Sequence, residues 1–500
     1  MKPIRKIALI SPNPRLQDFQ GRLLFMENVL PTIGTVLRDA GYEVGVFMEK
    51  IAPIPWERVF QADLVGFSAV TCTVNPAYEM AKKIKARKDV PIVLGGPHAS
   101  MMPQDAIQHV DYVIREEGEE TILELLEVLN KGGDVSTIKG LSYLHHGEAH
   151  HNPVRGLVKN FDTVPDLSLV HGYDKLSAFK LLLQAKGHVH FLETSRGCPY
   201  PCKFCWRIGG KTVRHRSFEN VIADLKHKLS VFTSFPNWTL IIDSYFGVNR
   251  ERSKEVLRGI VASGIKVNLL LFARCEIAED LEMLDLMRKA GVKWIFMGIE
   301  SIHDSTLNHF DKRQTLQKVR RSIKAIREHH IQVYGSFVLG SDDDPSDTPI
   351  KTVEFAREVG LTWVMFNILT DFQSGEGELS LPFYKIFQKD WDYYNLHYVI
   401  HYPKNMRASE LQEKVIDAYQ SFYSWRTLLS NLMKGRVEMA FYQWFRRFMI
   451  KPLLKEMKAY IPYLKKVEEG MYDASGRLME EKLIPPQERE KDGEVVSQVA

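Results

Sequence analysis

Three of the five cysteines in this chain lie within eight residues of one another. Cys198, Cys202 and Cys205 are separated by spacings of four and three residues, with a glycine and two prolines among their neighbours. Such residues favour a tight, non-helical loop. Three thiolates on one loop can converge on an iron–sulfur cluster, and because these clusters usually take four cysteines, three local ligands leave one iron open. The sequence therefore predicts that residues 196–205 bind a cluster with an exchangeable ligand.

Two other interpretations of these cysteines are open: a structural zinc site and three unrelated thiols. Zinc would need a fourth ligand, for which His188, His190 and His215 are candidates, but structural zinc favours two paired ligand knuckles. Cys72 and Cys275 stand apart and are expected to be ordinary buried thiols. Five cysteines in 500 residues form no disulfide framework, which indicates a reducing compartment, and we expect a cytoplasmic protein.

The cysteine loop follows the first of six predicted strand–helix units. We expect strands near 189–194, 238–243, 266–272, 293–299, 331–339 and 361–368. Helices are expected near 217–230, 250–263, 280–290, 314–329 and 349–358, with a less regular one after 380. Six such units predict a partial (βα)6 TIM-type barrel, in which chemistry lies at the carboxyl ends of the strands.

An earlier alternation of strands and helices predicts a doubly wound parallel sheet, followed by a hairpin near 139–155. The expected strands lie near 6–10, 42–47, 62–70, 91–96 and 111–115, and the helices near 27–40, 76–87 and 119–131. The whole chain is therefore expected to be α/β, with a C-terminal helical region. We expect segments at 1–150 (doubly wound domain), 151–187 (linker), 188–375 (partial barrel), 376–466 (helical region) and 467–500 (acidic, partly disordered tail).

The CxxxCxxC spacing, with Phe204 just before its last cysteine, resembles the radical S-adenosylmethionine (radical SAM) enzymes. The resemblance implies that a 4Fe–4S cluster on the three cysteines binds S-adenosylmethionine through its open iron, and that an external electron donor such as flavodoxin or ferredoxin drives formation of a 5′-deoxyadenosyl radical. It also implies that further cofactor-binding residues lie at the strand ends, namely Arg274, Glu300, Ser301, Gly335, Gly340, Phe366 and Asn367.

Each of these strand-end residues has a chemical role that the resemblance suggests. Glu300 resembles the acid that binds ribose, and Arg274 the arginine near the carboxylate of S-adenosylmethionine. The segment Gly335 to Gly340 resembles the strand that passes under adenine, and Phe366 and Asn367 offer backbone contacts to that base. Alternatively, Glu300 and Arg274 pair with each other and the glycines serve tight packing. Asp243 and the cluster Asp342 to Asp344 are weaker candidates.

Upstream, residues 62–73, 95–100 and 111–119 resemble the Rossmann-like cobalamin-binding domain that precedes the barrel in one class of radical SAM enzymes. The expected cofactor-binding residues are two glycines and three hydroxyl side chains at strand ends, namely Ser68, Thr71, Thr73, Gly95 and Gly96. An empty doubly wound crevice is the alternative. The DxHxxG loop that supplies a cobalt ligand elsewhere is absent, and His98 is the nearest candidate, expected beside the cofactor's periphery.

The resemblance, which covers about residues 1–425, implies a cobalamin-dependent radical SAM enzyme. The common reaction of this class is C-methylation of an unactivated carbon, by hydrogen abstraction and methyl transfer from methylcobalamin. Oxidative cyclisation, hydroxylation or rearrangement without methyl transfer is the alternative. A methylthiotransferase is disfavoured because Cys72 and Cys275 cannot supply a second cluster, and a non-catalytic cobalamin sensor has no use for an open iron.

Net charge and the distribution of apolar and basic residues indicate which kinds of partner to expect. With 66 Lys and Arg against 62 Asp and Glu, net charge gives no sign of a nucleic-acid partner. No apolar run reaches the about 20 residues of a membrane span, and we expect no secretory signal. Within the basic segment 421–466, residues 444–451 mix bulky apolar and basic side chains, which motivates a peripheral membrane contact and a lipid-like substrate. The alternative is a helix packed on the barrel with a solvated basic face. A small-molecule substrate is expected in either case. A modified tetrapyrrole, a peptide or an antibiotic intermediate is also open as the substrate.

Overall fold

The computed structural model describes residues 3–17, 23–173, 187–206, 209–231, 238–372, 385–473, 475–479 and 482–483. Parts of the expected linker and acidic tail, and the start of the helix expected after 380, lie outside these residues. The chain divides into two compact units. The first comprises residues 1–201, 205–298 and 318–334, and the second residues 202–204, 299–317 and 335–500.

The first sheet has the predicted doubly wound form. Its strand order is β3-β1-β4-β5-β6-β7-β8, with β3 to β6 parallel and the β7–β8 hairpin antiparallel. The strands are β1 Lys6–Ser11, β3 Glu43–Met48, β4 Leu64–Ser68, β5 Ile92–Gly95, β6 Tyr112–Ile114, β7 Leu141–His145 and β8 Glu148–His151. The order reverses between β1 and β4, and ligands of such sheets bind at the carboxyl ends of the strands at this point.

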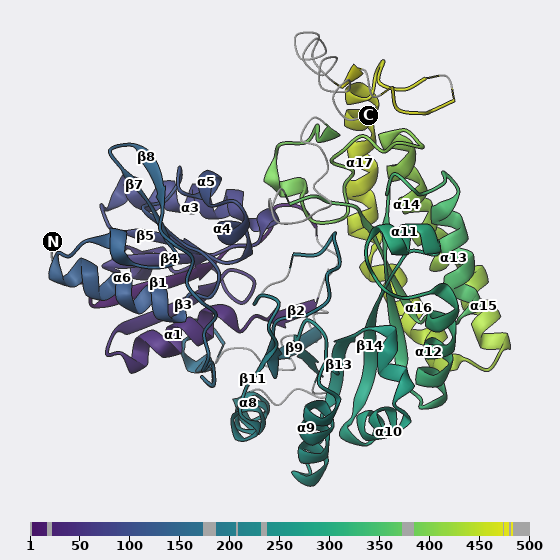
Figure 1. Ribbon diagram of the computed structural model, residues 1–500, viewed down its shortest axis with the longest axis horizontal. Coiled ribbons are helices and arrows are strands. Elements are labelled where there is room, and N and C mark those ends of the chain that lie inside the picture. The colour runs from purple at the N-terminus through teal and green to yellow at the C-terminus, as the bar shows by residue number, and fades with distance from the viewer. Residues whose placement is uncertain are drawn as a thin grey trace, which may run out of the picture. The chain divides into compact units, whose positions relative to one another are not determined.

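Helices cover both faces of this sheet, which is why its parallel strands are apolar throughout. Figure 1 shows α1 and α6 on one side of the strands and α3 on the other. The helices are α1 Val29–Asp39, α2 Trp56–Phe60, α3 Val74–Arg87, α4 Pro97–Met101, α5 Pro103–Ala106 and α6 Glu119–Lys131. Helix α6 ends where the sequence predicts, because Gly132 adopts a left-handed φ of 69° as its C-cap.

The second sheet contains all six predicted barrel strands in chain order, and one more. Its order is β16-β15-β14-β13-β12-β9-β2. The predicted strands are β9 Gly187–Leu192, β12 Trp238–Ile241, β13 Asn268–Ala273, β14 Val292–Glu300, β15 Gln332–Leu339 and β16 Trp363–Ile368. The intervening helices are α8 Phe218–Val231, α9 Arg250–Ala262, α10 Leu281–Ala290, α11 Asp304–His309, α12 Leu316–Glu328 and α13 Thr348–Glu358. The sheet is a curled, parallel half-barrel.

The additional strand comes from the N-terminal part of the chain. β2 (Leu23–Met26) pairs in parallel with β9, and the Asn28 side-chain amide donates to the Phe191 carbonyl at 3.1 Å just beyond it. The sequence analysis missed β2 because its four residues run directly into the apolar face of α1. A strand this short is specified by its partner more than by its own residues.

The C-terminal region consists of four helices, α14 Ala408–Phe422, α15 Trp425–Met433, α16 Val437–Met449 and α17 Lys451–Val467. α14 protects the backbone of β16 through two tyrosines one helical turn apart. The Tyr419 hydroxyl accepts from the Phe366 N–H at 2.9 Å, and the Tyr423 hydroxyl accepts from the Val364 N–H at 3.0 Å. Both hydroxyls also donate to the carbonyl of the same strand residue. The two tyrosines thus satisfy a strand edge that would otherwise be open to pairing.

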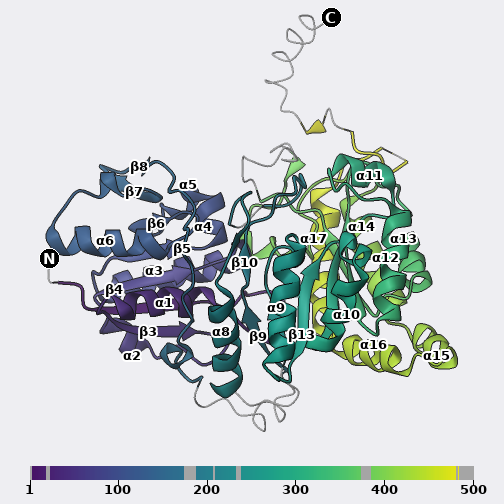
Figure 2. The same cartoon turned by 60° about the horizontal axis from the view of Figure 1, so that its bottom comes forward.

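Figure 2 shows α15 and α16 at the edge of the second unit, and Asn431 of α15 donates to Gln443 of α16 at 2.9 Å. Among the described residues, we find no helix whose length and apolar character would allow it to cross a membrane.

Candidate active site

The cysteine loop is an excursion between two short paired strands. β10 (Ser195–Arg196) pairs antiparallel with β11 (Arg214–His215), and the three cysteines lie on the chain between them. The Cys198 N–H donates to the Gly210 carbonyl at 3.0 Å, which ties the start of the loop to its return. The loop therefore has a fixed base.

Gly197 makes this base possible. It adopts a φ of 93°, and a Cβ there would lie 2.3 Å from the Thr212 carbonyl oxygen. Only glycine fits so close an approach of two backbones.

Asp243, which follows β12, holds the chain that leads into the loop. Its buried carboxylate accepts four hydrogen bonds, from the N–H and hydroxyl groups of Thr194 and Ser195. Burial raises the pKa of Asp243, and the four donors oppose that shift. The sequence analysis ranked this residue low, but the structure gives it a positioning role directly before the cysteines.

None of the three loop cysteines forms a disulfide; Cys198 and Cys202 are half-buried and Cys205 is exposed. Three thiols on one short loop are the donor set that a 4Fe–4S cluster with an open iron requires. Within the described residues, no three His, Cys, Asp or Glu side chains gather closely enough to hold a metal ion. The cysteines thus fit the cluster by their chemistry and their order along the loop, and not by convergence of their side chains on one point.

Arg274 is placed beside the cysteine loop by the end of β13. Its guanidinium lies 3.9 Å from the centroid of the Tyr200 ring, which stands between Cys198 and Cys202 in the chain. Glu276 accepts from Arg274 at 3.2 and 3.3 Å. The predicted anion-binding arginine is thus buried, paired and close to the loop. Glu276 is thus one ion-pair partner of this arginine.

Glu300 ends β14 in the second unit and pairs with Lys312, whose Nζ lies 2.7 Å from its Oε1. Its φ of 67° is left-handed, a conformation that costs a non-glycine residue about 1–3 kcal/mol. Such strain concentrates at functional positions at the ends of strands. The next residue, Ser301, is buried and its Oγ accepts from the His303 N–H.

The cysteine loop also has an anchor within the second unit. The Lys203 N–H donates to the Phe310 carbonyl at 3.0 Å, and the Phe204 and Phe310 rings lie 5.0 Å apart. The aromatic residue before the last cysteine is therefore packed in the apolar core.

Gly335 and Gly340 meet local packing requirements. A Cβ on Gly335 would lie 2.5 Å from the Leu361 side chain, and one on Gly340 would lie 2.6 Å from that of Leu411. Gly340 also has a left-handed φ of 93°. The sequence alternative, that these glycines serve close packing, describes what the structure shows.

The two residues expected near adenine differ in which of their polar groups are already hydrogen-bonded. The backbone N–H and C=O of Phe366 already bond the Tyr419 hydroxyl. Asn367 donates from Nδ2 to the Ser336 hydroxyl at 2.9 Å, while its buried Oδ1 has no hydrogen-bond partner in the described part of the chain. A buried acceptor without a donor is costly unless a ligand supplies one. Asn367 therefore fits a nucleoside-binding role better than Phe366 does.

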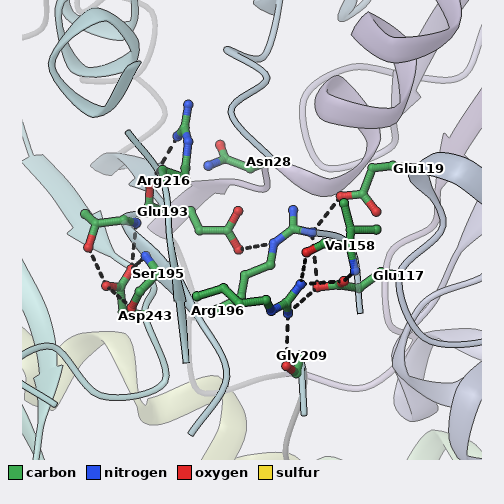
Figure 3. Close-up of polar contacts among 12 residues, drawn as sticks. Asn28, Glu117, Glu119, Val158, Glu193, Ser195, Arg196, Gly209, Arg216 and Asp243 are labelled. Atoms are coloured by element: carbon green, nitrogen blue, oxygen red, sulfur yellow. Dashed lines mark hydrogen bonds and ion pairs between the residues drawn. The ribbon is translucent and has the colours of Figure 1, made fainter. Parts of the chain in front are cut away.

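Figure 3 shows a set of charged residues that joins the first sheet to the cysteine loop. Glu117, in the turn before α6, accepts from Arg214 at 2.7 Å and from Arg196 at 3.3 Å. Arg196 also donates to Glu119 at 2.7 Å and to Glu193 at 2.9 Å. Both arginines belong to β10 and β11, the base of the loop.

The pKa directions agree with strong pairing in this network. Burial alone would raise the pKa of Glu117, but Arg214, the Val158 N–H and Arg196 outweigh burial and lower it. Burial alone would lower the pKa of Arg196, but Glu193 and Glu119 outweigh it and raise that pKa. Pairing thus favours the charged forms of Glu117 and Arg196, whereas burial raises the pKa of Glu193 despite its pairing with Arg196. Glu117 belongs to the segment 111–119 that carries the resemblance, but its contact with the base of the cysteine loop was not predictable from the sequence.

The residues expected at the cobalamin crevice lie together after β4 and β5. Ser68 ends β4, and Thr71 and Thr73 lie in a turn of 3-10 helix directly after it. The buried Thr71 Oγ1 has no hydrogen-bond partner among the described contacts, whereas Thr73 Oγ1 bonds the backbone of Val70. Thr71 is therefore the hydroxyl still available to a ligand at this edge.

Gly95 and Gly96 end the neighbouring strand β5. Gly96 has a φ of 98°, and a Cβ there would lie 2.9 Å from the Ala69 carbonyl oxygen and 3.1 Å from Ser68 Oγ. This glycine lets the turns after β4 and β5 pack against each other, which shapes the crevice edge.

His98 is buried between two partners, the Tyr78 hydroxyl at 3.2 Å and Asp105 Oδ2 at 3.1 Å. Burial, reinforced by Asp105, raises the pKa of Tyr78. Because His98 is fully enclosed, it is built into the domain rather than exposed beside the crevice.

A cavity of about 410 Å³ opens at the carboxyl end of β1, lined by the turn after β1, by Glu49 and by one side of α3. Its polar groups come from Asn13, Arg15, Glu49, Glu79 and Lys83, and Met80 forms part of its apolar wall. A recess at the switch point of a doubly wound sheet is where such domains bind ligands.

Two family models match the chain. The B12 binding domain model covers residues 29–126, and the Radical SAM superfamily model covers residues 192–356. The first contains the crevice residues after β4 and β5, and the second contains the cysteine loop and strands β12 to β15.

Several known proteins resemble the chain over most of its length. An uncharacterized methyltransferase of Pyrococcus horikoshii is 28% identical over 73% of this chain and 79% of its own. The anaerobic magnesium-protoporphyrin IX monomethyl ester cyclase of Cereibacter sphaeroides is 25% identical over 76% of this chain and 62% of its own. The hopanoid C-3 methylase of Methylococcus capsulatus is 27% identical over 68% of this chain and 65% of its own.

Among solved structures, the radical S-adenosylmethionine methyltransferase TsrM from Kitasatospora setae has the same fold. It superposes with a TM-score of 0.61 at 20% identity and covers 72% of each chain.

The chain thus joins a B12-binding domain to a radical SAM domain. It is a member of the cobalamin-binding radical SAM enzymes, and its cofactors are cobalamin, a 4Fe–4S cluster and S-adenosylmethionine.

Proposed function

We propose that this enzyme methylates an unactivated carbon of an apolar small molecule. The observation that carries the proposal is the joining, in one chain, of a three-thiol loop after the first barrel strand to a cobalamin-type crevice. When bound, the three cofactors supply a hydrogen-abstracting 5′-deoxyadenosyl radical and a transferable methyl group. The protein supplies positioning and the exclusion of water.

In this proposal the cysteines bind the cluster and the strand-end residues bind S-adenosylmethionine. Cys198, Cys202 and Cys205 are the cluster ligands. Arg274, set against the Tyr200 ring, is suited to a carboxylate. Glu300, strained and paired with Lys312, is suited to two ribose hydroxyls, and Asn367 Oδ1 to a donor on the base.

Other predicted residues shape these sites through their packing. We propose that Ser301, Gly335, Gly340 and Phe366 line the nucleoside path at the ends of β14 to β16. In the first sheet, Ser68, Thr71 and Thr73 with Gly95 and Gly96 form the edge over which cobalamin lies. Cobalt would have no protein histidine ligand from His98, because that side chain is enclosed.

Formation of the 5′-deoxyadenosyl radical needs an electron that the side chains of this protein do not supply. We propose an external donor of the flavodoxin or ferredoxin type. A reducing, cytoplasmic location follows, because the loop thiols must stay reduced to bind iron.

The second candidate reaction is an oxidative cyclisation with the same cofactors. It is supported by the similarity to a magnesium-protoporphyrin IX monomethyl ester cyclase. The two reactions differ in whether a methyl group enters the product.

Methyl transfer can be tested with S-adenosylmethionine carrying a deuterated methyl group. The reconstituted enzyme is incubated anaerobically with pooled membrane lipids or with tetrapyrroles, and products are analysed by mass spectrometry. We expect a product that contains the deuterated methyl group and depends on Cys202. A product that loses hydrogen without gaining the label would instead establish the cyclase-type reaction.

A further inference from the structure

Helix α16 packs through a buried face of mixed polarity. Beside Met439, Ala440 and Met449, this face carries the polar residues Gln443 and Arg446, which are almost fully buried. Arg446 lies over the Trp363 ring of β16 at 5.6 Å, and the Trp363 indole N–H donates to the Tyr442 carbonyl at 3.0 Å. The alternative from the sequence, a helix packed on the barrel with a solvated basic face, is therefore right about the packing on β16 but wrong about Arg446, which is buried.

The outward side of α15 and α16 is apolar. We call it the aromatic face, and it consists of Trp425, Leu429, Leu432, Met433, Val437, Phe441, Trp444, Phe445 and Phe448. These nine account for more than half of the 17 large apolar side chains that stand exposed in the described part of the chain, and for all of the exposed Trp and Phe. They recur at intervals of three and four residues, so they form one stripe on each helix.

The stripes of the two helices are continuous with one another. Phe441, Trp444 and Phe448 follow each other at ring distances of 6.1 and 5.1 Å. The Arg447 guanidinium of α16 lies 5.4 Å from the Trp425 ring of α15 and so joins the two helices.

A basic cavity of about 330 Å³ adjoins this face. It lies among α14, α16 and α17 and is lined by four cations, Arg447, Lys451, Lys455 and Lys458. Two of these cations also touch the aromatic face, because Arg447 lies over Trp425 and the Lys451 Nζ lies 4.7 Å from the Phe448 ring. An anion-sized recess thus stands directly beside an exposed apolar surface.

We propose that the aromatic face docks on an anionic lipid bilayer, with lipid phosphates held in the basic cavity. An exposed aromatic stripe bordered by Lys and Arg matches the boundary between acyl chains and anionic headgroups. The charges disfavour a second copy of this chain, since Arg426, Lys434, Arg447 and Lys451 of two copies would face each other across the contact. This proposal goes beyond the methylation reaction and does not depend on it.

The test is co-sedimentation of the full-length protein with lipid vesicles. One set contains phosphatidylcholine alone, and the other contains about 30% phosphatidylglycerol, so that only the second is anionic. We expect binding to the anionic vesicles that weakens with added salt. In the variant F441S/F448S, the partition coefficient should fall about tenfold or more, because binding scales with the apolar area inserted.

Two further variants test whether binding depends on the basic cavity and on the aromatic face in particular. K455Q/K458Q removes charge from the cavity and should weaken binding to anionic vesicles only. L281S/I350S removes two exposed apolar side chains elsewhere, 60% and 47% exposed, and should bind as the wild type does. Circular dichroism and sedimentation velocity confirm folding and oligomeric state for every variant.

Three outcomes would overturn the proposal. The wild type does not bind either vesicle, or the F441S/F448S variant binds as well as the wild type. In the third, the wild type forms a dimer that this variant loses, without vesicle binding, and the face is then a contact between copies. None of these readouts depends on catalysis, so they are separable from the outcome of the methylation test.

Discussion

At the scale of single residues, the five cysteines differ sharply in their surroundings. Cys275 is fully buried, and burial raises its pKa to about 12. The three loop cysteines are half-buried or exposed, and Cys72 is half-buried, so the expectation of a buried thiol is right for Cys275 and wrong for Cys72. Since the thiolate is the reactive form, burial and a raised pKa make Cys275 an inert thiol.

Limited alkylation of the metal-free protein at pH 8 should therefore label the loop cysteines well before Cys275. After reconstitution with iron and sulfide, the label should disappear from Cys198, Cys202 and Cys205. Peptide mass spectrometry reads both results, with Cys275 as the internal control. Loop cysteines that remain reactive in the iron-loaded protein would argue against their role as ligands.

Tyr419 offers a second prediction at this scale. Its hydroxyl bonds both backbone groups of Phe366, so the substitution Tyr419→Phe leaves a buried N–H without a partner. We expect the free energy of unfolding to fall by about 1–3 kcal/mol. Tyr463→Phe is the matched control, because that ring is 38% exposed, and it should change stability little. Equal stability of the two variants in urea would show that the edge of β16 does not need this bond.

At the scale of elements, the charged network joins the turn before α6 to the strands β10 and β11. Glu117→Gln removes the charge that faces Arg196 and Arg214 while keeping the size of the side chain. Breaking a buried ion pair from one side costs about 3–5 kcal/mol. We expect lower thermal stability and a smaller amount of cluster retained after reconstitution. Glu120→Gln, which removes a more exposed partner of Arg155, is the control and should leave both unchanged.

The dependence on pH follows from the lowered pKa of Glu117. A carboxylate with a depressed pKa in the folded state stabilises the protein above its ordinary value of about 4.5 and loses that contribution as the pH falls below it. The difference in unfolding free energy between wild type and Glu117→Gln should therefore be constant near neutral pH and shrink below about pH 4.5. A difference that grows on acidification would contradict the assignment.

Long apolar runs made most elements predictable. Strand β15 and its neighbours read as strands because they are buried on both faces, and α6 ends at Gly132 because only a left-handed residue closes it there. β2 was not predictable, since its partner β9 lies about 160 residues further along the chain. The apolar character of the exposed side of α16 was also hidden, because periodicity shows that a helix has two faces but not which of them packs.

The residues of the candidate site, too, were only partly predictable from the sequence. The spacing of the cysteines and the strand-end positions of Arg274 and Glu300 were visible in the sequence. Their partners Glu276 and Lys312 were not, because these lie on turns whose course only the fold determines.

At the scale of the whole molecule, the enzyme has two sheets that carry different cofactor-binding residues. The doubly wound sheet carries Ser68 and Thr71, where we propose that cobalamin lies, and the half-barrel carries the cysteine loop at its first strand end. The aromatic face of α15 and α16 belongs to neither sheet, which leaves it open to a partner such as a lipid surface. An apolar substrate and a membrane-docking face are mutually consistent.

The central claim is that one chain uses cobalamin and a radical SAM cluster for methyl transfer. The most direct measurement is anaerobic reconstitution with iron, sulfide and hydroxocobalamin, followed by reductant and S-adenosylmethionine with a deuterated methyl group. We predict that the protein retains cobalamin, that the deuterated methyl group appears on it, and that 5′-deoxyadenosine forms. With Cys202→Ala, 5′-deoxyadenosine should be lost while cobalamin is retained. Retained cobalamin without label and without 5′-deoxyadenosine, in the presence of lipid and tetrapyrrole substrates, would contradict the account.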